Sequence, residues 1–231
     1  MQTDDSTTIS NLRPRRERSR EHLTQAEVAK LLNASRDKTL SRHPERDYCL
    51  FLLMVRHGLR VTEACRLKLS DVHMEEKELN VKRLKNGKPA THPLFIGEVK
   101  AIKVWMVKRQ EMSLDALTLG AGDSLFISER RTPLSRSMVW LLMQRYAKAA
   151  GLEGLHVHPH MLRHACGFDL AHRGTDTRLI QGFLGHKNIQ HTVQYTELDP
   201  ERFKTIYPMD PPERRGGTAM KMASQLAFAS S

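Results

Sequence analysis

The chain has 231 residues and a mass of 26.5 kDa, enough for one well-packed core with additional tails. Its 37 Lys and Arg residues against 26 Asp and Glu give a net charge of +11, which favours a polyanionic partner, nucleic acid before membrane. Charge alone leaves a merely basic, soluble protein as the alternative. The sequence has no run of eighteen apolar residues and its N-terminus is polar, so we expect a cytoplasmic protein without a signal peptide or membrane contacts.

The chain begins with a polar, basic segment. Residues 1–20 have no apolar periodicity and end in NLRPRRERSR, which carries five arginines against one glutamate. This composition predicts a basic N-terminal arm that is disordered when free. Two interpretations remain open for the arm: a solvated tail, or a segment that lies along nucleic-acid phosphates.

Two predicted helices open the folded part. Thr24 and Glu27 match a capping box ahead of a helix that contains Val28, Leu31 and Leu32. Residues 44–56 are largely apolar and predict a buried helix that ends at Gly58. The cysteines lie in apolar helical surroundings without a Cys-x-x-Cys pair, so reduced core thiols are expected rather than a disulfide or zinc site: Cys49, Cys65 and Cys166.

A short helix and a hairpin follow. Arg60 comes after a glycine turn and Glu63 stands three residues later at a helix start, which alone indicates a surface pair worth about a few tenths of a kcal/mol. Residues 78–94 flank Asn86-Gly87, a strong type I′ turn signal, and predict a β-hairpin. Lys85 lies beside the turn, where lysines are usually solvent-exposed.

The middle of the chain predicts a helix, a loop, a strand and another helix. Residues 98–111 form the amphipathic helix, residues 124–128 the short strand, and the last helix runs to Ala150. Because helix N-termini bind phosphate readily, the arginines at the turn and helix start are candidate DNA-backbone contacts, with an exposed basic loop as the alternative: Arg130, Arg131 and Arg136.

The segment 158–195 predicts three short helices that carry reactive side chains. Pro159 suits a first helical turn, and His160 and Arg163 are three residues apart, on one helix face. Gly174 ends this helix, Asp176 caps the next, and Gly185 ends that one in turn. His186 therefore emerges at a helix end, and Tyr195 follows nine residues later.

These residue types fit a phosphate better than a metal ion. Guanidinium groups bind phosphate oxygens in pairs, imidazoles exchange single protons near neutrality, and a phenol becomes a nucleophile once deprotonated. Arginine does not ligate metals, and no carboxylate lies at ligand spacing. A crowd of histidines keeps a metal site as the weaker alternative: His156, His158, His160 and His164.

The same residues resemble the tyrosine recombinase (phage integrase) family. Its motif runs His-x-x-Arg, then Gly-His, then a tyrosine nine residues after that histidine with a threonine three before it. The matching positions are His160, Arg163, Gly185, His186, Thr192 and Tyr195. The wording of this segment is similar to short bacterial recombinases that invert fimbrial promoter switches. The resemblance covers roughly residues 23–203 and implies a mainly α catalytic domain with a small antiparallel β-sheet, an α+β fold.

The resemblance also implies how the phosphate would be held. Arg60, in a Gly-x-Arg-x-x-Glu setting, and Arg163 would clamp the non-bridging oxygens, an electrostatic contribution that needs no metal or cofactor. Glu63 would help to hold the site. His186 would donate a hydrogen bond to the phosphate.

Proton transfer is assigned in the same way. Tyr195 would be the nucleophile and His160 the acceptor of its proton, while Lys85, on the hairpin, would protonate the leaving 5′ oxygen. His164 would support either the site or the core. The product implied is a 3′-phosphotyrosyl link, so rejoining needs no ATP.

We therefore expect a site-specific DNA recombinase that inverts a fimbrial promoter segment in nucleoid DNA. Its domains would be the arm 1–20, a catalytic domain 21–207 and a tail 208–231 that can dock on a neighbouring subunit. Expected partners are double-stranded DNA with inverted repeats, three further copies of the chain in a tetramer, and accessory DNA-bending proteins, since no clamp domain precedes the catalytic one. The alternatives are a type IB-like DNA-relaxing enzyme, a non-catalytic DNA-binding regulator and a metal-dependent hydrolase.

Overall fold

The computed structural model describes residues 20–83, 89–114 and 122–196. The chain divides into two units, Met1–Glu197 and Leu198–Ser231, and every described residue belongs to the first. Several predictions fall outside the described residues: most of the basic arm, Lys85 with the Asn86-Gly87 turn, and the tail 208–231.

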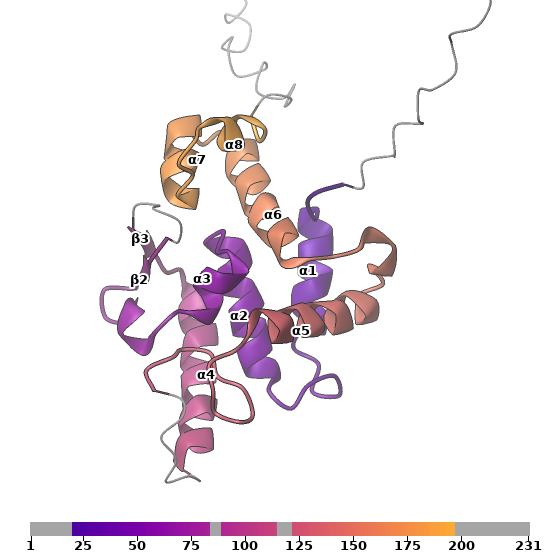
Figure 1. Cartoon of the computed structure of the whole chain (residues 1–231), viewed down its shortest axis with the longest axis vertical. Helices are drawn as coiled ribbons and strands as arrows, with labels where there is room; N and C mark the ends of the chain where they lie inside the picture. Colours follow the sequence, from indigo (N-terminus) through magenta and orange to yellow (C-terminus); the bar gives the residue numbers. More distant parts are fainter. Residues whose placement is uncertain (1–19, 84–88, 115–121, 197–231) are drawn as a thin grey trace, which may run out of the picture. The chain divides into compact units, whose positions relative to one another are not determined.

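The described chain is mainly helical with one small antiparallel sheet, as expected (Figure 1). In chain order the elements are α1 (Gln25–Ala34), α2 (Pro44–Arg56), α3 (Val61–Cys65), the 3-10 turn η1 (Leu69–Asp71), β1 (Val72–His73), β2 (Glu78–Val81), β3 (Ala90–Pro93), α4 (Ile96–Leu114), α5 (Arg136–Ala149), the 3-10 turn η2 (Glu153–Leu155), α6 (Pro159–His172), α7 (Thr177–Leu184) and α8 (Gln190–Val193). None of the described helices is long and apolar enough to cross a membrane.

Helix α2 is the centre of the core. It packs against α1, α3, α4 and α6, and all but three of its residues are buried. Its neighbour α1 starts with the predicted capping box, since Thr24 accepts from the Glu27 amide and Glu27 accepts from the Thr24 amide. All three cysteines are free and buried, which confirms the expected core thiols.

The sheet has the order β1-β2-β3, and its hairpin β2–β3 confirms the predicted one. The described pairs run from Val81 with Ala90 to Glu78 with Pro93. Along β2 the side chains of Leu79 and Val81 face the core, which fixes the inward face of this strand.

Two predictions need correction. The amphipathic helix extends to Ile96–Leu114 rather than 98–111. Residues 124–128 form only isolated bridges, Lys68 with Ser124 and Ile127 with Pro133, instead of a strand. Their apolar run is explained by burial alone, because Leu125, Phe126 and Ile127 are fully covered by surrounding elements while their backbone bonds to different segments in turn.

Candidate active site

The candidate residues of the C-terminal segment are brought together by the ends of α6, α7 and α8. Pro159 is the first residue of α6, which places His160 and Arg163 in its first turns. Asp176 caps α7 by accepting from the amides of residues 178 and 179. Helix α7 contacts both α6 and β3 (Figure 1), so the hairpin and the histidine-bearing turn after α7 lie beside the same site.

Gly185 makes the turn that carries His186. Its φ of +66° is left-handed, and a Cβ there would lie 2.7 Å from Cγ of Arg83. Both the backbone conformation and the close approach therefore require glycine. The Nδ1 atom of His186 lies 2.8 Å from the Thr192 hydroxyl, which orients the imidazole.

A buried group of charges lies at the base of this site, and we call Glu63 with Arg60, Arg83 and Arg163 the Glu63 cluster. One Glu63 oxygen meets the guanidinium of Arg60 at 2.7 Å, and the other meets that of Arg83 at 2.9 Å. Burial raises the pKa of the Glu63 carboxyl, but the Arg60 amide and the two arginine charges outweigh it and lower the pKa overall. Three guanidinium groups face one carboxylate, so two positive charges remain unbalanced.

Arg163 is the most constrained cation of the cluster. It is 3% exposed and donates to the carbonyls of Gly58 and Leu184 at 2.5 and 2.6 Å. Burial, followed by the charges of Arg60 and Arg83, lowers its pKa to about 10. Burial and the two neighbouring guanidinium charges both disfavour the charged form of Arg163, and a bound anion would stabilise it.

Tyr195 lies against α6 with only 4% of its surface exposed. Its hydroxyl lies 3.0 Å from Nδ1 of His164, and its ring packs on Gly167, where a Cβ would be 2.6 Å from the ring. Burial raises the pKa of the Tyr195 phenol to about 12. The phenol is therefore protonated, and His164 rather than His160 is its partner.

The two motif histidines are neutral at physiological pH. Burial, together with the charges of Arg163 and Arg60, lowers the pKa of His186 to about 3. Loss of hydration and the charge of Arg163 also lower the pKa of His160. A neutral imidazole can accept a proton, and one whose Nδ1 accepts from a hydroxyl carries its own proton on Nε2, from which it donates.

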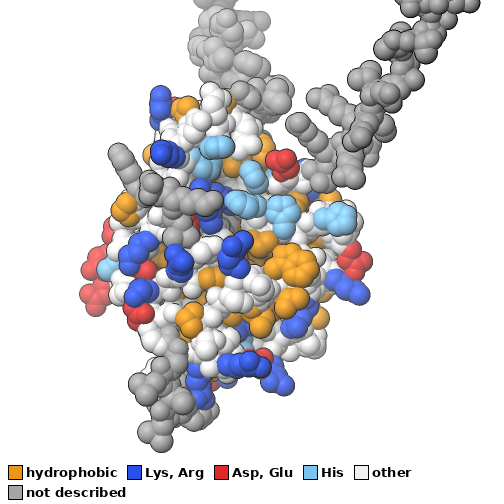
Figure 2. All heavy atoms as spheres, in the orientation of Figure 1, with side chains coloured by type: hydrophobic (Ala, Val, Ile, Leu, Met, Phe, Trp, Pro, Cys, Tyr) orange, Lys and Arg blue, Asp and Glu red, His pale blue; other side chains and the backbone are white. Residues whose placement is uncertain are grey.

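The structure thus brings Arg60, Glu63, Arg163, His186 and Tyr195 to one place, with His160 and His164 on α6 beside them. Figure 2 shows histidine side chains close to Lys and Arg side chains on one face of the molecule. The predicted DNA-backbone contacts lie on other segments. Arg130 is exposed and lines a cleft of about 800 Å³ with segments 38–46 and 128–145, Arg136 is the exposed first residue of α5, and Arg131 is half-buried with a φ of +61°.

Sequence reasoning missed Arg83. Its side chain is fully buried, although KRLK looks like a solvated basic stretch. The alternation of β2 was the available signal, because Arg83 continues the inward positions of Leu79 and Val81. A charge on the inward face of a strand indicates a buried partner, which here is Glu63.

The histidine crowd does not form a metal site in the structure. Among the described residues, no group of three or more His, Cys, Asp or Glu side chains is arranged to hold a metal ion. Two of the four histidines, His160 and His164, face each other with ring centroids 6.0 Å apart.

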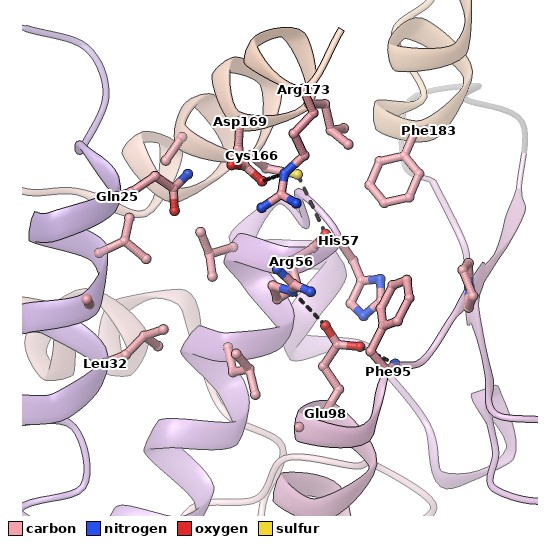
Figure 3. Close-up of a pocket in the computed structure, with 18 of the residues that line it drawn as sticks. Gln25, Leu32, Arg56, His57, Phe95, Glu98, Cys166, Asp169, Arg173 and Phe183 are labelled. Carbon is pink, nitrogen blue, oxygen red and sulfur yellow. Dashed lines mark hydrogen bonds and ion pairs between the residues drawn. The ribbon is translucent and has the colours of Figure 1, made fainter. Parts of the chain in front are cut away.

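A separate groove lies between α1, α2, α4 and α6 (Figure 3). It has a volume of about 540 Å³ and is lined mainly by apolar side chains together with Arg56, Glu98, Asp169 and Arg173. Of the candidate site residues that the structure describes, none lines this groove. The clustered charges, rather than this cavity, therefore mark the candidate active site.

Comparison with known proteins decides what these charges belong to. The model of the phage integrase family matches residues 21–202. The chain belongs to the phage integrase family. The chain is 42% identical over 190 residues to the type 1 fimbriae regulatory protein FimB of Escherichia coli K12. The aligned region covers 82% of this chain and 90% of FimB.

Two further relatives agree. The type 1 fimbriae regulatory protein FimE of Escherichia coli K12 is 44% identical over 165 residues, or 70% of this chain and 79% of FimE. The crystal structure of XerA recombinase matches 80% of this chain with a TM-score of 0.66 and 29% identity, and the chain spans 63% of that structure. The predicted tyrosine recombinase fold is thereby confirmed for this phage integrase family member.

Proposed function

We propose that this chain is a site-specific DNA recombinase that cuts and rejoins DNA through a 3′-phosphotyrosine and inverts a promoter segment that controls fimbrial expression. The observation that carries the proposal is the Glu63 cluster, with two unbalanced positive charges next to Tyr195. A buried excess of guanidinium charge is suited to bind the negatively charged oxygens of a phosphodiester. The similarity to FimB and FimE over most of their length supports the fimbrial role.

In the proposed reaction the Tyr195 oxygen attacks phosphorus and the bond to the 5′ oxygen breaks. His160, which is neutral, takes the phenol proton, and Lys85 gives a proton to the leaving oxygen. Arg60 and Arg163 hold the non-bridging oxygens while negative charge develops on them. His186 donates from Nε2 in the tautomer whose Nδ1 accepts from the Thr192 hydroxyl. The phosphotyrosine keeps the bond energy, so the reverse attack by a 5′ hydroxyl reseals the strand.

The position of Tyr195 adds a step before chemistry. Its phenol is buried and bonded to His164, so we infer that the side chain leaves this position before it attacks a phosphate at the Glu63 cluster. The Arg60 side chain is 26% exposed, so Arg60 is the arginine of the cluster that an incoming phosphate would contact first. His164 therefore acts in this proposal as the resting partner of the nucleophile.

We further propose double-stranded DNA with inverted repeats as substrate and a tetramer as the active assembly, assisted by DNA-bending proteins. The arm 1–20 and the arginines Arg130, Arg131 and Arg136 would contact phosphates beyond the cut site. The tail 208–231 would dock on a neighbouring subunit. The net charge of +11 supports the contacts to DNA.

The test starts from the recognition sequence. Half-sites are selected from a random duplex library by binding to the purified chain. A nicked duplex that carries the selected half-site is then incubated with the chain in buffer containing EDTA. We expect a covalent protein–DNA species on a denaturing gel, and inversion of a plasmid segment flanked by two inverted sites. Absence of the adduct, with cleavage that chelation abolishes, would contradict the proposal, and relaxation of plasmids without any site would favour the type IB-like alternative.

A further inference from the structure

Arg83 is the buried residue that neither the motif nor the proposed chemistry uses. It lies two residues after Val81, at the end of β2, and its side chain is completely shielded from solvent. Burying a guanidinium group is costly unless it is paired and its N–H groups find acceptors. The contacts of Arg83 therefore show what the chain gains from it.

The first contact is with Glu63. The Arg83 guanidinium meets Oε2 at 2.9 Å, while Arg60 meets Oε1 at 2.7 Å and its backbone amide also donates to Oε2 at 2.9 Å. Arg83 and Arg60 thus share one carboxylate from opposite sides. Because Arg83 occupies one oxygen, Glu63 cannot turn both oxygens onto Arg60, and part of the Arg60 charge stays available to a phosphate.

The second set of contacts is with backbone carbonyls. One Arg83 nitrogen donates to the carbonyl of Phe183 and, at 3.2 Å, to that of His57. The carbonyl of Phe183 belongs to the last turn of α7, where no further helical amide can satisfy it. The side-chain stem of Arg83 also packs against Gly185. Arg83 therefore holds the end of α7, from which His186 emerges.

We propose that Arg83 is a positioning residue for recombination, fixing Arg60 through Glu63 and His186 through the C-terminal end of α7. The inference rests on the proposed function. One buried side chain thereby links Arg60, on the turn before α3, to the end of α7 that carries His186.

The experiment measures the single-turnover rate of covalent adduct formation on the nicked half-site duplex, with the half-site dissociation constant measured in parallel. Arg83→Met should lower the rate about 10- to 100-fold, the range for losing an oriented hydrogen bond to a charged group, and leave the dissociation constant close to that of the wild type. Arg109→Met is the matched control, since Arg109 is also buried and donates to the carbonyls of Ser124 and Gly122. It should lower the melting temperature without lowering the rate.

A double-mutant cycle tests the route through Glu63. Because Arg83 acts partly through this carboxylate, Glu63→Gln combined with Arg83→Met should lower the rate by less than the product of the two single effects. Arg83→Lys keeps the charge and serves if the methionine variant does not fold. Its three N–H groups sit on one atom, whereas Arg83 meets Glu63 and Phe183 with two different nitrogens, so the rate of the lysine variant should also fall.

Three results would overturn the inference: a wild-type rate in both Arg83 variants, a loss equal to that of Arg109→Met, or fully multiplicative effects in the cycle. A wild-type chain that forms no adduct would instead contradict the proposed function.

Discussion

Two buried carboxylates organise this protein in different ways. Asp47 accepts from Arg46 at 2.8 Å and from the hydroxyls of Ser41 and Tyr146 at 2.6 Å, and we call these four residues the Asp47 cluster. Arg46 also donates to the carbonyl of residue 127 at 3.0 Å. One guanidinium balances one carboxylate here, whereas the Glu63 cluster has two positive charges in excess.

The difference separates stability from function. A balanced, fully bonded ion pair gains nothing from a further ligand, and breaking it leaves an uncompensated buried charge. An excess of like charge raises the energy of the folded chain until an anion arrives. The net charge of a buried cluster, more than its burial, therefore marks the site of chemistry. The following changes test it, from the largest expected effect to the smallest.

The largest effect is expected from Tyr195→Phe. The change removes one oxygen next to the Glu63 cluster and little volume, so folding and DNA binding should persist while the covalent adduct disappears completely. The assay is the nicked duplex on a denaturing gel, with melting temperature as control. An adduct formed by the phenylalanine variant would move the nucleophile to another tyrosine, Tyr146 or Tyr207.

Asp47→Asn should have the largest effect on stability. It leaves the charge of Arg46 buried without its counter-ion, which costs about 3–5 kcal/mol of unfolding free energy. Urea denaturation measures this loss. At a temperature where the variant is folded, its rate of adduct formation should equal that of wild type. A rate that falls in proportion to stability would erase the distinction between the two clusters.

Arg163→Lys changes the other cluster without removing charge. Lysine lacks the planar fork that meets the Gly58 and Leu184 carbonyls and would meet a phosphate, so adduct formation should slow about 10²- to 10³-fold, as for loss of one oriented donor to developing charge. Gel-shift titration should show that half-site binding survives. Binding lost together with cleavage would assign Arg163 to DNA affinity.

Tyr146→Phe is the counterpart of Tyr195→Phe. Burial, with the Asp47 charge beside it, raises the pKa of the Tyr146 phenol, so this hydroxyl is a permanent donor to Asp47. Its removal should cost about 1.5–3 kcal/mol, with a fall in Tm of about 2–4 °C per kcal/mol for a chain of this size. Adduct formation should be unchanged, and a slower reaction would mean that the Asp47 cluster also serves catalysis.

The smallest effect of a single substitution is expected from His92, one of three buried histidines on the side of the Glu63 cluster that make the chain sensitive to acid. Burial lowers the pKa of His57 and His186 to about 3 and that of His92 to about 4. His57 lies near Phe95 and Phe183 (Figure 3), and its carbonyl accepts from Arg83. The unfolded chain binds protons on these histidines as the pH falls through about 6.5, while the folded chain does not until about 3–4. Stability should therefore be full above pH 6.5 and decline below it.

Urea denaturation between pH 8 and 5 measures this decline. Each buried histidine contributes up to about 1.4 kcal/mol per pH unit, so His92→Gln should flatten the slope by up to one proton. The exposed His156, changed to asparagine, is the control and should leave the slope unaltered. A slope insensitive to His92→Gln would contradict this assignment.

What could be predicted from the sequence follows the range of the interactions. Pro159, Asp176 and Gly185 act within a helical turn, so the three helices of 158–195 and the positions of their motif residues were predictable. Arg83 reaches Phe183 across 100 residues, and Tyr146 reaches Asp47 across 99. No local pattern encodes such pairs, and both clusters emerged only from the fold.

The same limit explains the errors. The apolar residues 125–127 are buried by surrounding elements rather than by strand pairing, so their hydrophobicity suggested the wrong element. The hairpin was predictable from the Asn86-Gly87 turn signal, but its register depends on which side chains the core accepts. The resting partner of Tyr195 was not predictable either, because the bond to His164 depends on how α8 returns to α6.

The ring of Tyr195 rests where α6 has a glycine, with no room for even one methyl group at residue 167. The resting position of the reactive phenol is therefore shaped by an absent side chain rather than by a group that binds phosphate. An alanine at residue 167 would exclude the phenol from its resting position. The variant would change how readily Tyr195 becomes available for attack, without altering any charged group of the site.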